Sequence, residues 1–244
     1  DDGTLLGIND RSQLADAELE MRLRINEAHM RAGVTMQDPA TTYIDASVEI
    51  GEDVTLEPNV HLRGETVIEQ EAVIRTGSQI FDSRIGARTV VWSSVLEGST
   101  VDEDVTIGPF SHVRKGAYIG PNVELGNYAE VKNSNIGAGT KSHHFSYLGD
   151  ADVGEKVNIG AGSITANYDG VNKHRTRIGA GAFIGSDTML ATVIRGLSDE
   201  NGSWKMNWKS ARRRRSRSPR NAVSSSPSMI SLQPIRAYST FAGR

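Results

Sequence analysis

The amino-acid sequence predicts an all-β solenoid of hexapeptide repeats, preceded by one N-terminal helix. From Ile44 onward an aliphatic residue returns at every sixth position, a period that fits neither a helix nor a two-sided strand. Glycine is frequent, with 25 residues, whereas aromatic residues make up only 6% of the 244 residues. This composition suits a fold built from many small turns rather than a core of large side chains.

The helix is expected over residues 12 to 32, where apolar residues recur at alternating spacings of three and four. This stripe consists of Leu14, Ala17, Met21, Ile25, Ala28 and Ala32. Gly33 follows in the position that helices use for a left-handed cap. We expect the stripe to pack against the body of the protein rather than to line a ligand pocket.

The hexapeptide pattern runs in three stretches. The first consists of Ile44, Ile50, Leu56, Leu62, Ile68, Ile74 and Ile80. The register slips at Ile85, and the second stretch consists of Val101, Ile107, Val113, Ile119, Leu125 and Val131. After a further slip at Ile136, the pattern returns at Ile178, Ile184 and Leu190. In a hexapeptide β-helix each repeat supplies one short strand and a corner, and these aliphatic side chains stack inside the coil.

One insertion interrupts the coil. Residues 165 to 177, TANYDGVNKHRTR, combine turn-forming residues with several basic ones. Because the stacked core has no room for extra residues, we expect this segment to protrude as a loop, and such loops often carry function.

The chain is an acidic body with a basic tail. Residues 201 to 244 contain ten Lys or Arg and no Asp or Glu, which leaves 17 basic and 30 acidic residues before them. An Arg/Ser-rich tail can bind nucleic acid or an anionic surface. No aromatic stacking pattern accompanies these charges, so we favour a disordered tail and expect no nucleic-acid partner. Because the repeat stops after Leu190, where another coil is expected, a change of reading frame there stays an alternative.

Composition excludes several kinds of site. The chain contains no cysteine, so it has no disulfide, thiolate zinc site or cysteine nucleophile. Neither a P-loop nor a Gly-x-Ser-x-Gly nucleophile elbow occurs. No stretch approaches the ~18 apolar residues of a membrane helix. We expect a soluble, cytoplasmic protein without membrane contact.

Several polar residues in and around the coil suggest chemistry. They are Arg114, Lys132, His144, Tyr147, Asn158, Asn167, Tyr168 and Lys173. Alternate side chains of a strand point outward, so residues from successive coils can converge on one outer groove. Three cations with a histidine and a tyrosine suit a phosphorylated substrate that must lose a proton during reaction.

Each of these residues also has a structural interpretation. Arg114 and Lys132 can be ordinary surface charges, and Tyr147 can cover a coil edge. Asn158 can face inward and bond to backbone. We expect His143, which precedes His144, to be a solvated neighbour.

Three stretches carry a family resemblance: TIGPFSHVRKGA, the segment from NYAEVKN to HRTRIG, and FIGSDTML. They resemble the acetyltransferase half of the bacterial bifunctional N-acetylglucosamine-1-phosphate uridyltransferase / glucosamine-1-phosphate N-acetyltransferase. The opening GINDRSQLADAE resembles the end of that family's uridyltransferase domain and its linker helix. The motifs K-x-x-H-x-x-Y-L-G-D and N-Y-D-G are long and specific, and the resemblance covers roughly residues 5 to 190.

The resemblance implies a left-handed β-helix, a homotrimer with sites between subunits, and acetyl transfer from acetyl-CoA to glucosamine 1-phosphate. By this resemblance His144 is the general base. The residues that would hold the sugar phosphate are Arg114, Lys132, Tyr147, Asn158 and Lys173. Those that would face acetyl-CoA are Ala161, Asn167, Tyr168 and Ser186. Asn9 matches a magnesium contact of the uridyltransferase site, the rest of which is absent here, so we expect no uridyl transfer.

The expected division is residues 1–40 for the linker helix and the end of the uridyltransferase domain, 41–190 for the acetyltransferase coil, and 191–244 for the atypical tail. The family continues its coil beyond Leu190, whereas here Trp204 and Asn221 stand near the remaining cofactor positions without matching the pattern. A catalytically impaired structural or binding solenoid, truncated or frameshifted, is therefore an alternative. A hexapeptide acyltransferase for another amino sugar is a third, which the N-Y-D-G loop disfavours.

Overall fold

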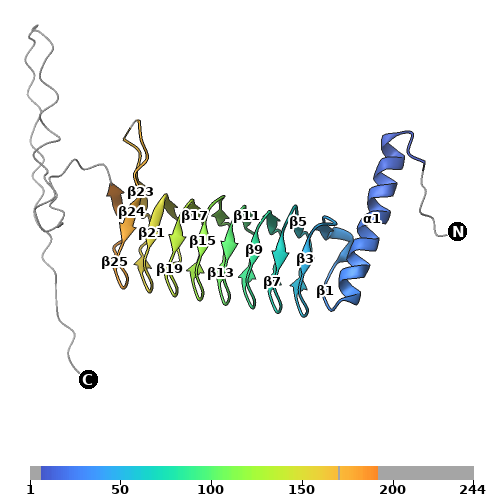
Figure 1. The fold of residues 1–244 in the computed structure, drawn as a ribbon, viewed down its shortest axis with the longest axis horizontal. Coiled ribbons are helices and arrows are strands. Elements are labelled where there is room, and N and C mark those ends of the chain that lie inside the picture. The colour runs from blue at the N-terminus through green and yellow to red at the C-terminus, as the bar shows by residue number, and fades with distance from the viewer. Residues whose placement is uncertain (1–6, 170, 192–244) are drawn as a thin grey trace, which may run out of the picture. The chain divides into compact units, whose positions relative to one another are not determined.

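Strands in this protein pair with strands one turn of the chain away, which makes the fold a parallel β-solenoid (Figure 1). The structure, a computed structural model, describes residues 7–169 and 171–191. The tail predicted over 191–244, with Trp204 and Asn221, lies outside the described residues apart from Ala191. The division into segments at residues 40 and 190 stays a prediction.

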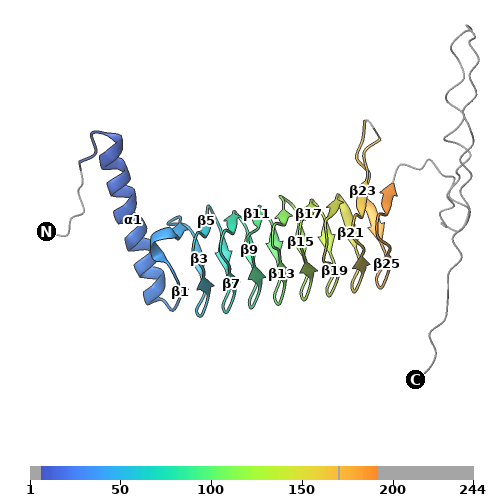
Figure 2. The same ribbon diagram turned by 180° about the vertical axis from the view of Figure 1, so that it is seen from behind.

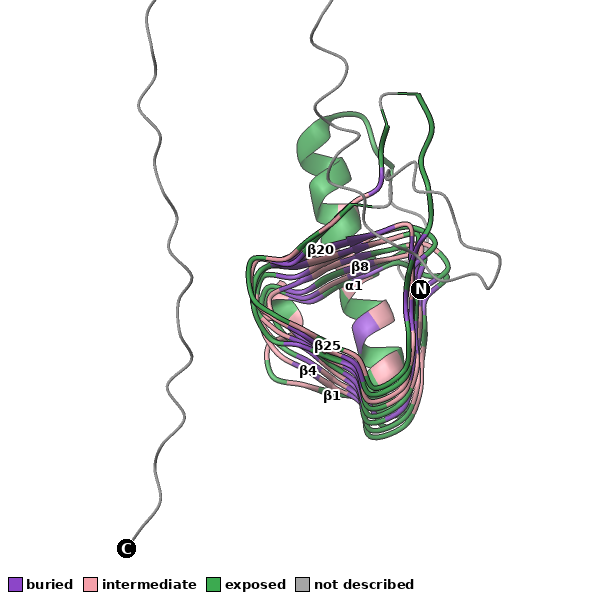
Figure 3. Cartoon of the chain, turned by 90° about the vertical axis from the view of Figure 1, so that its left-hand side faces the viewer, coloured by how far each residue is buried: buried purple, intermediate pink, exposed green. Residues whose placement is uncertain are grey.

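The described strands form three parallel sheets, each along one side of the coil, as the end-on view shows (Figure 3). The first, sheet A, contains β1 (Thr35–Met36), β4 (Thr55–Leu56), β7 (Val73–Ile74), β10 (Val90–Val91), β13 (Thr106–Ile107), β16 (Glu124–Leu125), β19 (Lys141–Ser142), β22 (Asn158–Ile159) and β25 (Phe183–Ile184). Sheet B contains β2 (Tyr43–Ile44), β5 (His61–Arg63), β8 (Gln79–Phe81), β11 (Val95–Glu97), β14 (His112–Val113), β17 (Ala129–Lys132), β20 (Ser146–Gly149), β23 (Ile164–Ala166) and β26 (Met189–Ala191). Sheet C contains β3 (Glu49–Ile50), β6 (Val67–Ile68), β9 (Arg84–Ile85), β12 (Thr100–Val101), β15 (Tyr118–Ile119), β18 (Asn135–Ile136), β21 (Ala151–Val153) and β24 (Thr176–Ile178).

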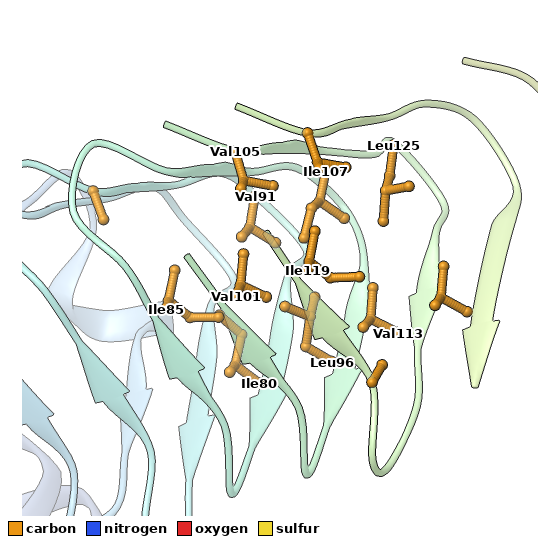
Figure 4. Packing of buried hydrophobic residues seen from close by; sticks show 14 of the residues in the cluster. Ile80, Ile85, Val91, Leu96, Val101, Val105, Ile107, Val113, Ile119 and Leu125 are labelled. Atoms are coloured by element: carbon orange, nitrogen blue, oxygen red, sulfur yellow. The ribbon is translucent and has the colours of Figure 1, made fainter. Parts of the chain in front are cut away.

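The predicted aliphatic ladder forms the core. Along most of the coil these side chains are fully buried and stack from one turn to the next (Figure 4). Toward the last described turn the burial decreases, and Ile184 and Leu190 are only partly buried.

The predicted slip of register at Ile85 is confirmed, but the inward ladder does not stop between Ile85 and Val101. Val91 and Leu96 continue the inward ladder there, and both are completely buried. The steps from Ile80 to Ile85 and from Val91 to Leu96 are one residue shorter than six, because some corners use one residue fewer.

The ladder also continues between Ile136 and Ile178, where sequence periodicity lost it. Leu148, Val153 and Ile159 point inward in that region and are buried. Two other inward positions hold polar residues, Ser142 and Thr165, at 0% and 2% exposure. Their hydroxyl groups are satisfied inside the coil, so a hydrophobicity pattern cannot find them although the strands are regular.

The N-terminal helix α1 (Arg11–Arg31) matches the predicted range closely, and Gly33 adopts the expected left-handed conformation with φ of 98°. Its N-terminus is capped by Asp10, whose carboxylate accepts a hydrogen bond from the Gln13 N–H at 2.8 Å. A 3-10 helix, η1 (Pro39–Thr41), leads from it toward the first strand of sheet B. No helix among the described residues is long and apolar enough to cross a membrane.

The expected packing of the whole apolar stripe is wrong. Leu14 and Met21 are 44% and 53% exposed, and only Ile25 of the stripe packs against the core. The helix crosses the N-terminal end of the coil, and its first turns project past the edge (Figures 1 and 2). Only its later turns cover the end of the stacked core, as a cap does in a solenoid.

Asn26 fixes this cap. Its side chain is completely buried and donates hydrogen bonds to the carbonyl oxygens of Pro39 and Thr42, at 2.9 and 3.0 Å. Arg22, one turn earlier, lies over the ring of Tyr43 at 4.5 Å.

Replacing Asn26 with Ala leaves both carbonyl groups without this donor, so we expect the helix to lose about 1–3 kcal/mol of local stability. Native-state amide exchange measures this as faster exchange across the second half of α1. Glu18→Ala changes an exposed residue of the same helix and is the control. Equal protection in both variants would contradict the role given to Asn26.

Candidate active site

His144 lies in the turn between β19 and β20, where the chain passes from sheet A to sheet B. A pocket of about 240 Å³ opens at this corner. It is lined by His143, His144, Asn158, Ile159, Gly160, Ala161, Phe183, Ile184 and Ser186. Successive turns of the coil therefore bring together four predicted site residues that are up to 42 positions apart in the chain.

The turn that carries His144 is tied down from two sides. On the outside, the Glu124 carboxylate binds Lys141 Nζ at 2.7 Å and His143 Nε2 at 2.6 Å. Bonds from Lys141 and His143 lower the pKa of Glu124, which stays ionised as a result. On the inside, the hydroxyl groups of Ser142 and Ser146 are hydrogen-bonded at 2.8 Å across the turn.

His143 is a solvated neighbour of His144, as expected, but it also has partners. Its side chain is 49% exposed, but it is paired with Glu124 and lines the pocket beside His144. Below it, Gly126 leaves room for the turn, because a Cβ atom there would overlap the His143 carbonyl group.

A second polar group occupies the outer face of sheet B. Arg114 follows β14 and forms an ion pair with Glu130 of β17 at 2.8 Å. Tyr147 of β20 stands next to Glu130 across the strand pair. Burial raises the pKa of Tyr147, with Glu130 and Asp150 adding to it, so its hydroxyl remains a hydrogen-bond donor.

Lys132 ends β17 and approaches Lys173 of the inserted loop. The ammonium group of Lys173 lowers the pKa of Lys132, to which burial and Arg114 contribute, whereas Asp150 raises it. Two neighbouring ammonium groups with an arginine nearby have the charge to bind an anion.

An inserted loop protrudes from the coil between β23 and β24, as predicted, but it is shorter than residues 165 to 177 (Figure 1). Both ends of that range belong to the strands of the coil, which leaves residues 167–175 for the loop. Tyr168 and Lys173 form an antiparallel bridge across it. Asp169 organises the turn, since its carboxylate accepts the Val171 and Asn172 N–H groups at 2.8 and 2.6 Å. His174 also binds this carboxylate, at 2.9 Å.

Comparison with known proteins agrees with this architecture. Residues 98–133 match the family described as bacterial transferase hexapeptide (six repeats). The bifunctional protein GlmU of Streptococcus equi subsp. zooepidemicus is 53% identical over 189 residues, which cover 78% of this chain and 41% of that protein. GlmU of Listeria monocytogenes serotype 4a is 49% identical over 190 residues, covering 78% and 42% respectively. The chain is a homologue of bifunctional GlmU. It spans about two fifths of the length of these relatives.

Similarity to solved structures is weaker. UDP-N-acetylglucosamine acyltransferase from Campylobacter jejuni has 17% identity and a TM-score of 0.45, over 64% of this chain and 66% of that chain. The acetyltransferase domain of PglB from Neisseria gonorrhoeae, in complex with acetyl coenzyme A, has 15% identity and a TM-score of 0.21, over 77% and 82%.

In this GlmU homologue the predicted site residues separate into two groups. His144, Asn158, Ala161 and Ser186 line the corner pocket, and Asn158 points outward rather than into the core. The sugar-phosphate candidates on sheet B and the loop do not line it: Arg114, Lys132, Tyr147 and Lys173. Of the two remaining loop residues, Asn167 is buried and Tyr168 is 61% exposed.

Asn9 lies away from both groups, ahead of α1, where its N–H donates to the Gln13 side chain at 2.6 Å. No cluster of three or more His, Asp or Glu able to hold a metal occurs among the described residues.

Sequence reasoning missed the carboxylates of the site. Glu124, Glu130 and Asp150 each lie about one turn of the coil from a residue that was predicted, and each contacts it or its neighbour. They could have been found by looking one turn before or after each predicted residue, because residues one turn apart lie side by side, as Glu130 and Tyr147 do.

The Asp169 hairpin gives a prediction for pH. The bond from His174 lowers the pKa of Asp169, as do the bonds from the Asn172 and Val171 N–H groups. A depressed pKa in the folded state means that the stabilisation is complete above the ordinary aspartate pKa of about 3.9 and is lost as the pH falls further. Amide protection at Val171 and Asn172 should therefore be high at pH 6 and decrease at pH 3.

Asp169→Asn should lower this protection at pH 6 and remove most of its dependence on pH. Asp53→Asn, which changes a corner of the coil far along the chain, is the matched control. Unchanged protection of the hairpin in Asp169→Asn would show that the carboxylate does not organise it.

Proposed function

We propose that this chain transfers the acetyl group of acetyl-CoA to the amine of glucosamine 1-phosphate. The product, N-acetylglucosamine 1-phosphate, is the precursor of UDP-N-acetylglucosamine, which is used for the cell wall. The observation that carries the proposal is the corner pocket, where His144 is joined by Asn158, Ala161 and Ser186 from other turns of the coil. The homology to part of GlmU supports it.

His144 acts as the general base. An ammonium group has no lone pair, so the sugar amine must lose a proton before or during its attack on the thioester. An imidazole takes up a proton near neutral pH, which suits this step. The turn around His144 is fixed from outside by Glu124 and from inside by the Ser142–Ser146 bond, so the ring is presented from a rigid backbone.

The sheet B group binds the phosphate. Arg114 presents a planar fork that can grip phosphate oxygens with two bonds, whereas Lys132 and Lys173 act as point charges. Tyr147 adds a neutral donor, because its hydroxyl stays protonated. Asn158 faces the pocket and orients the sugar there.

Acetyl-CoA approaches the pocket from the side of Ala161 and Ser186. Sites for whole ligands of that kind usually occupy about 300–1,000 Å³, more than the pocket of about 240 Å³ offers on one chain. The acetyl end fits there, and the remainder of the molecule must lie on a neighbouring surface. The exposed Tyr168 belongs to that surface, whereas Asn167 is buried and binds Asp150. Acetyl-CoA supplies the activated acyl group. His144 accepts the proton of the sugar amine, and the cations that bind the phosphate orient the sugar.

We also propose a homotrimer in which neighbouring copies complete each site. On a single chain Arg114, Lys132, Tyr147 and Lys173 do not line the pocket, and in a trimer a neighbouring copy brings its own cation group beside it. An edge of exposed aromatic side chains runs along the turns from sheet A to sheet B and ends beside His144. We call it the aromatic edge: Trp92, Phe110, Tyr128 and Phe145. Phe110 and Tyr128 stack at 5.5 Å, and exposed apolar strips of this kind mark protein interfaces.

Replacing His144 with Asn should lower acetyl transfer by about a hundredfold or more, as expected when a general base is removed. The assay mixes the protein with glucosamine 1-phosphate and acetyl-CoA and follows the release of free thiol. His143→Asn, at the neighbouring position, should lose less than about tenfold, because its ring is engaged by Glu124.

Both variants must assemble as the unmodified protein does, which sedimentation checks. An unmodified chain that assembles but releases no thiol would instead favour a structural or binding solenoid. Equal losses in the two variants would remove the special role of His144.

Replacing both Phe110 and Tyr128 with Asn should weaken assembly, since two exposed rings no longer become buried. At about 1.5–3 kcal/mol for each buried aromatic ring, removing two rings should raise the dissociation constant at least about a hundredfold. Asn suits both positions, because φ is 62° at Phe110 and 58° at Tyr128, a region that Asn tolerates.

Sedimentation velocity over a range of concentrations measures this effect. Tyr118→Asn, which removes an exposed ring from sheet C, is the control and should leave assembly unchanged. A double variant that still forms trimers as tightly as the unmodified protein would exclude the aromatic edge as the interface.

A further inference from the structure

Asp150 connects the coil to both ends of the inserted loop. Its carboxylate accepts one hydrogen bond from Asn133 at 2.6 Å and one from Asn167, at the start of the loop, at 2.9 Å. Its carbonyl oxygen accepts the N–H of Thr176, at the end of the loop, at 3.0 Å. One residue thus fixes the points where the loop leaves and rejoins the coil.

The backbone of Asp150 is held in an unusual conformation for this purpose. Its φ is 48°, in the left-handed region, where Asp is tolerated better than most residues because its short side chain bonds locally. Its N–H donates to the carbonyl oxygen of Lys132 at 2.9 Å. The residue is therefore tied directly to the end of the strand that carries Lys132.

The same carboxylate faces two cations. The carboxylate of Asp150 interacts electrostatically with Lys132, from β17, and with Lys173, from the loop. Burial alone would raise the pKa of Asp150, but the bonds from Asn133 and Asn167 and the charges of both lysines together lower it. Asp150 is therefore ionised at neutral pH and remains so when no anion is bound.

Lys132 and Lys173 repel each other, and a negative charge must offset this repulsion if both are to stay charged. The charged groups that face Lys132 are Lys173 from the loop, Arg114 from the end of β14 and Asp150. The nearby carboxylate of Glu130 is engaged by Arg114 at 2.8 Å. Asp150 is thus the carboxylate among them that favours the charged form of Lys132.

We infer that Asp150 is a positioning residue of the anion site: it holds the inserted loop so that Lys173 stands beside Lys132, and it is their counter-ion until a phosphate group binds. The inference rests on the proposed function for the identity of the ligand, the phosphate monoester of an amino sugar. A bound phosphate dianion supplies the negative charge itself, so the contribution of Asp150 is largest in the free protein.

The sign of the pH dependence follows from these charges. Lys132 binds the anion only when it is protonated, and Lys173 already lowers its pKa. Removing the Asp150 carboxylate lowers that pKa further, so anion binding should be lost at a lower pH than in the unmodified protein. A residue that only tethered the loop would weaken binding equally at every pH.

Asp150→Asn tests the inference, because Asn preserves the size of the side chain and removes its charge. Calorimetry on the full chain measures binding of glucosamine 1-phosphate and of inorganic phosphate between pH 7 and 9. We expect roughly tenfold weaker binding at pH 9 and less than about threefold at pH 7. In thiol-release assays KM for the sugar phosphate should rise while kcat changes less than about threefold.

Asp152→Asn is the matched control. Asp152 also tethers the loop, through Arg175 at 2.7 Å, and accepts a bond from Asn135 at 2.8 Å, but it is not among the groups that face Lys132. Its removal should loosen the loop without changing how binding depends on pH. Circular dichroism on both variants checks that the coil is intact.

A double-variant cycle separates charge from folding. Lys173→Met removes the repulsion, so the extra loss at pH 9 caused by Asp150→Asn should shrink when both changes are combined. If Asp150→Asn fails to fold, the inference is overturned in favour of a purely structural role. A uniform loss at all pH values, or the same pH dependence in Asp152→Asn, also overturns it.

Failure of the proposed function looks different. A protein that binds both phosphate compounds with this pH dependence but releases no thiol keeps the inference and loses the acetyltransferase proposal. An unmodified protein that binds neither compound at any pH overturns the inference, whatever its thiol release.

Discussion

The parallel pairing of each strand with the strand one turn below is the constraint on which the rest of the structure depends. It forces the inward side chains of each sheet into a narrow interior, where Leu96 stacks on Val113 and Ile107 on Leu125. It equally forces the outward side chains into columns, since residues one turn apart must stand one above the other. Lys141 therefore lies directly over Glu124 and under Asn158. The site is a consequence of register: a residue reaches it because of its place in a turn.

The corners are the parts of the coil whose structure can vary from turn to turn. A strand of two residues cannot vary its direction, whereas a corner can shorten by one residue, host a left-handed residue or release a loop. Asp150 occupies one such left-handed position and anchors the insertion. Gly126 occupies a place where close approach of the next turn excludes a Cβ atom, and it makes room for the histidine turn above it. The corner pocket and the inserted loop are found at corners for that reason, whereas Glu130, Lys132 and Tyr147 lie in strands of sheet B.

The fold was predictable where its physical cause is hydrophobic. The period of six identified most of the inward ladder, and the capping glycine located the end of the helix. The prediction failed where Ser142 and Thr165 replace aliphatic residues, because buried hydroxyl groups with hydrogen-bond partners look like surface positions in a sequence. The prediction also failed for Leu14 and Met21. An amphipathic stripe shows that a helix can pack against the coil, but it does not show what length of the helix the coil covers.

The candidate site was predictable only in part, and there is a physical reason why some of its features were predictable and others were not. Motif spacing singled out His144 and the cations, but no one-dimensional pattern shows that the cations do not line the pocket that contains His144. Whether a residue lines the pocket depends on the side of the corner from which its side chain projects. A convex solenoid presents ridges and shallow corners rather than deep clefts, so a site for a ligand as long as acetyl-CoA needs walls from elsewhere. In the arrangement that we propose, the inserted loop, fixed by Asp150, is one such wall, and the aromatic edge brings a neighbouring coil alongside as the other.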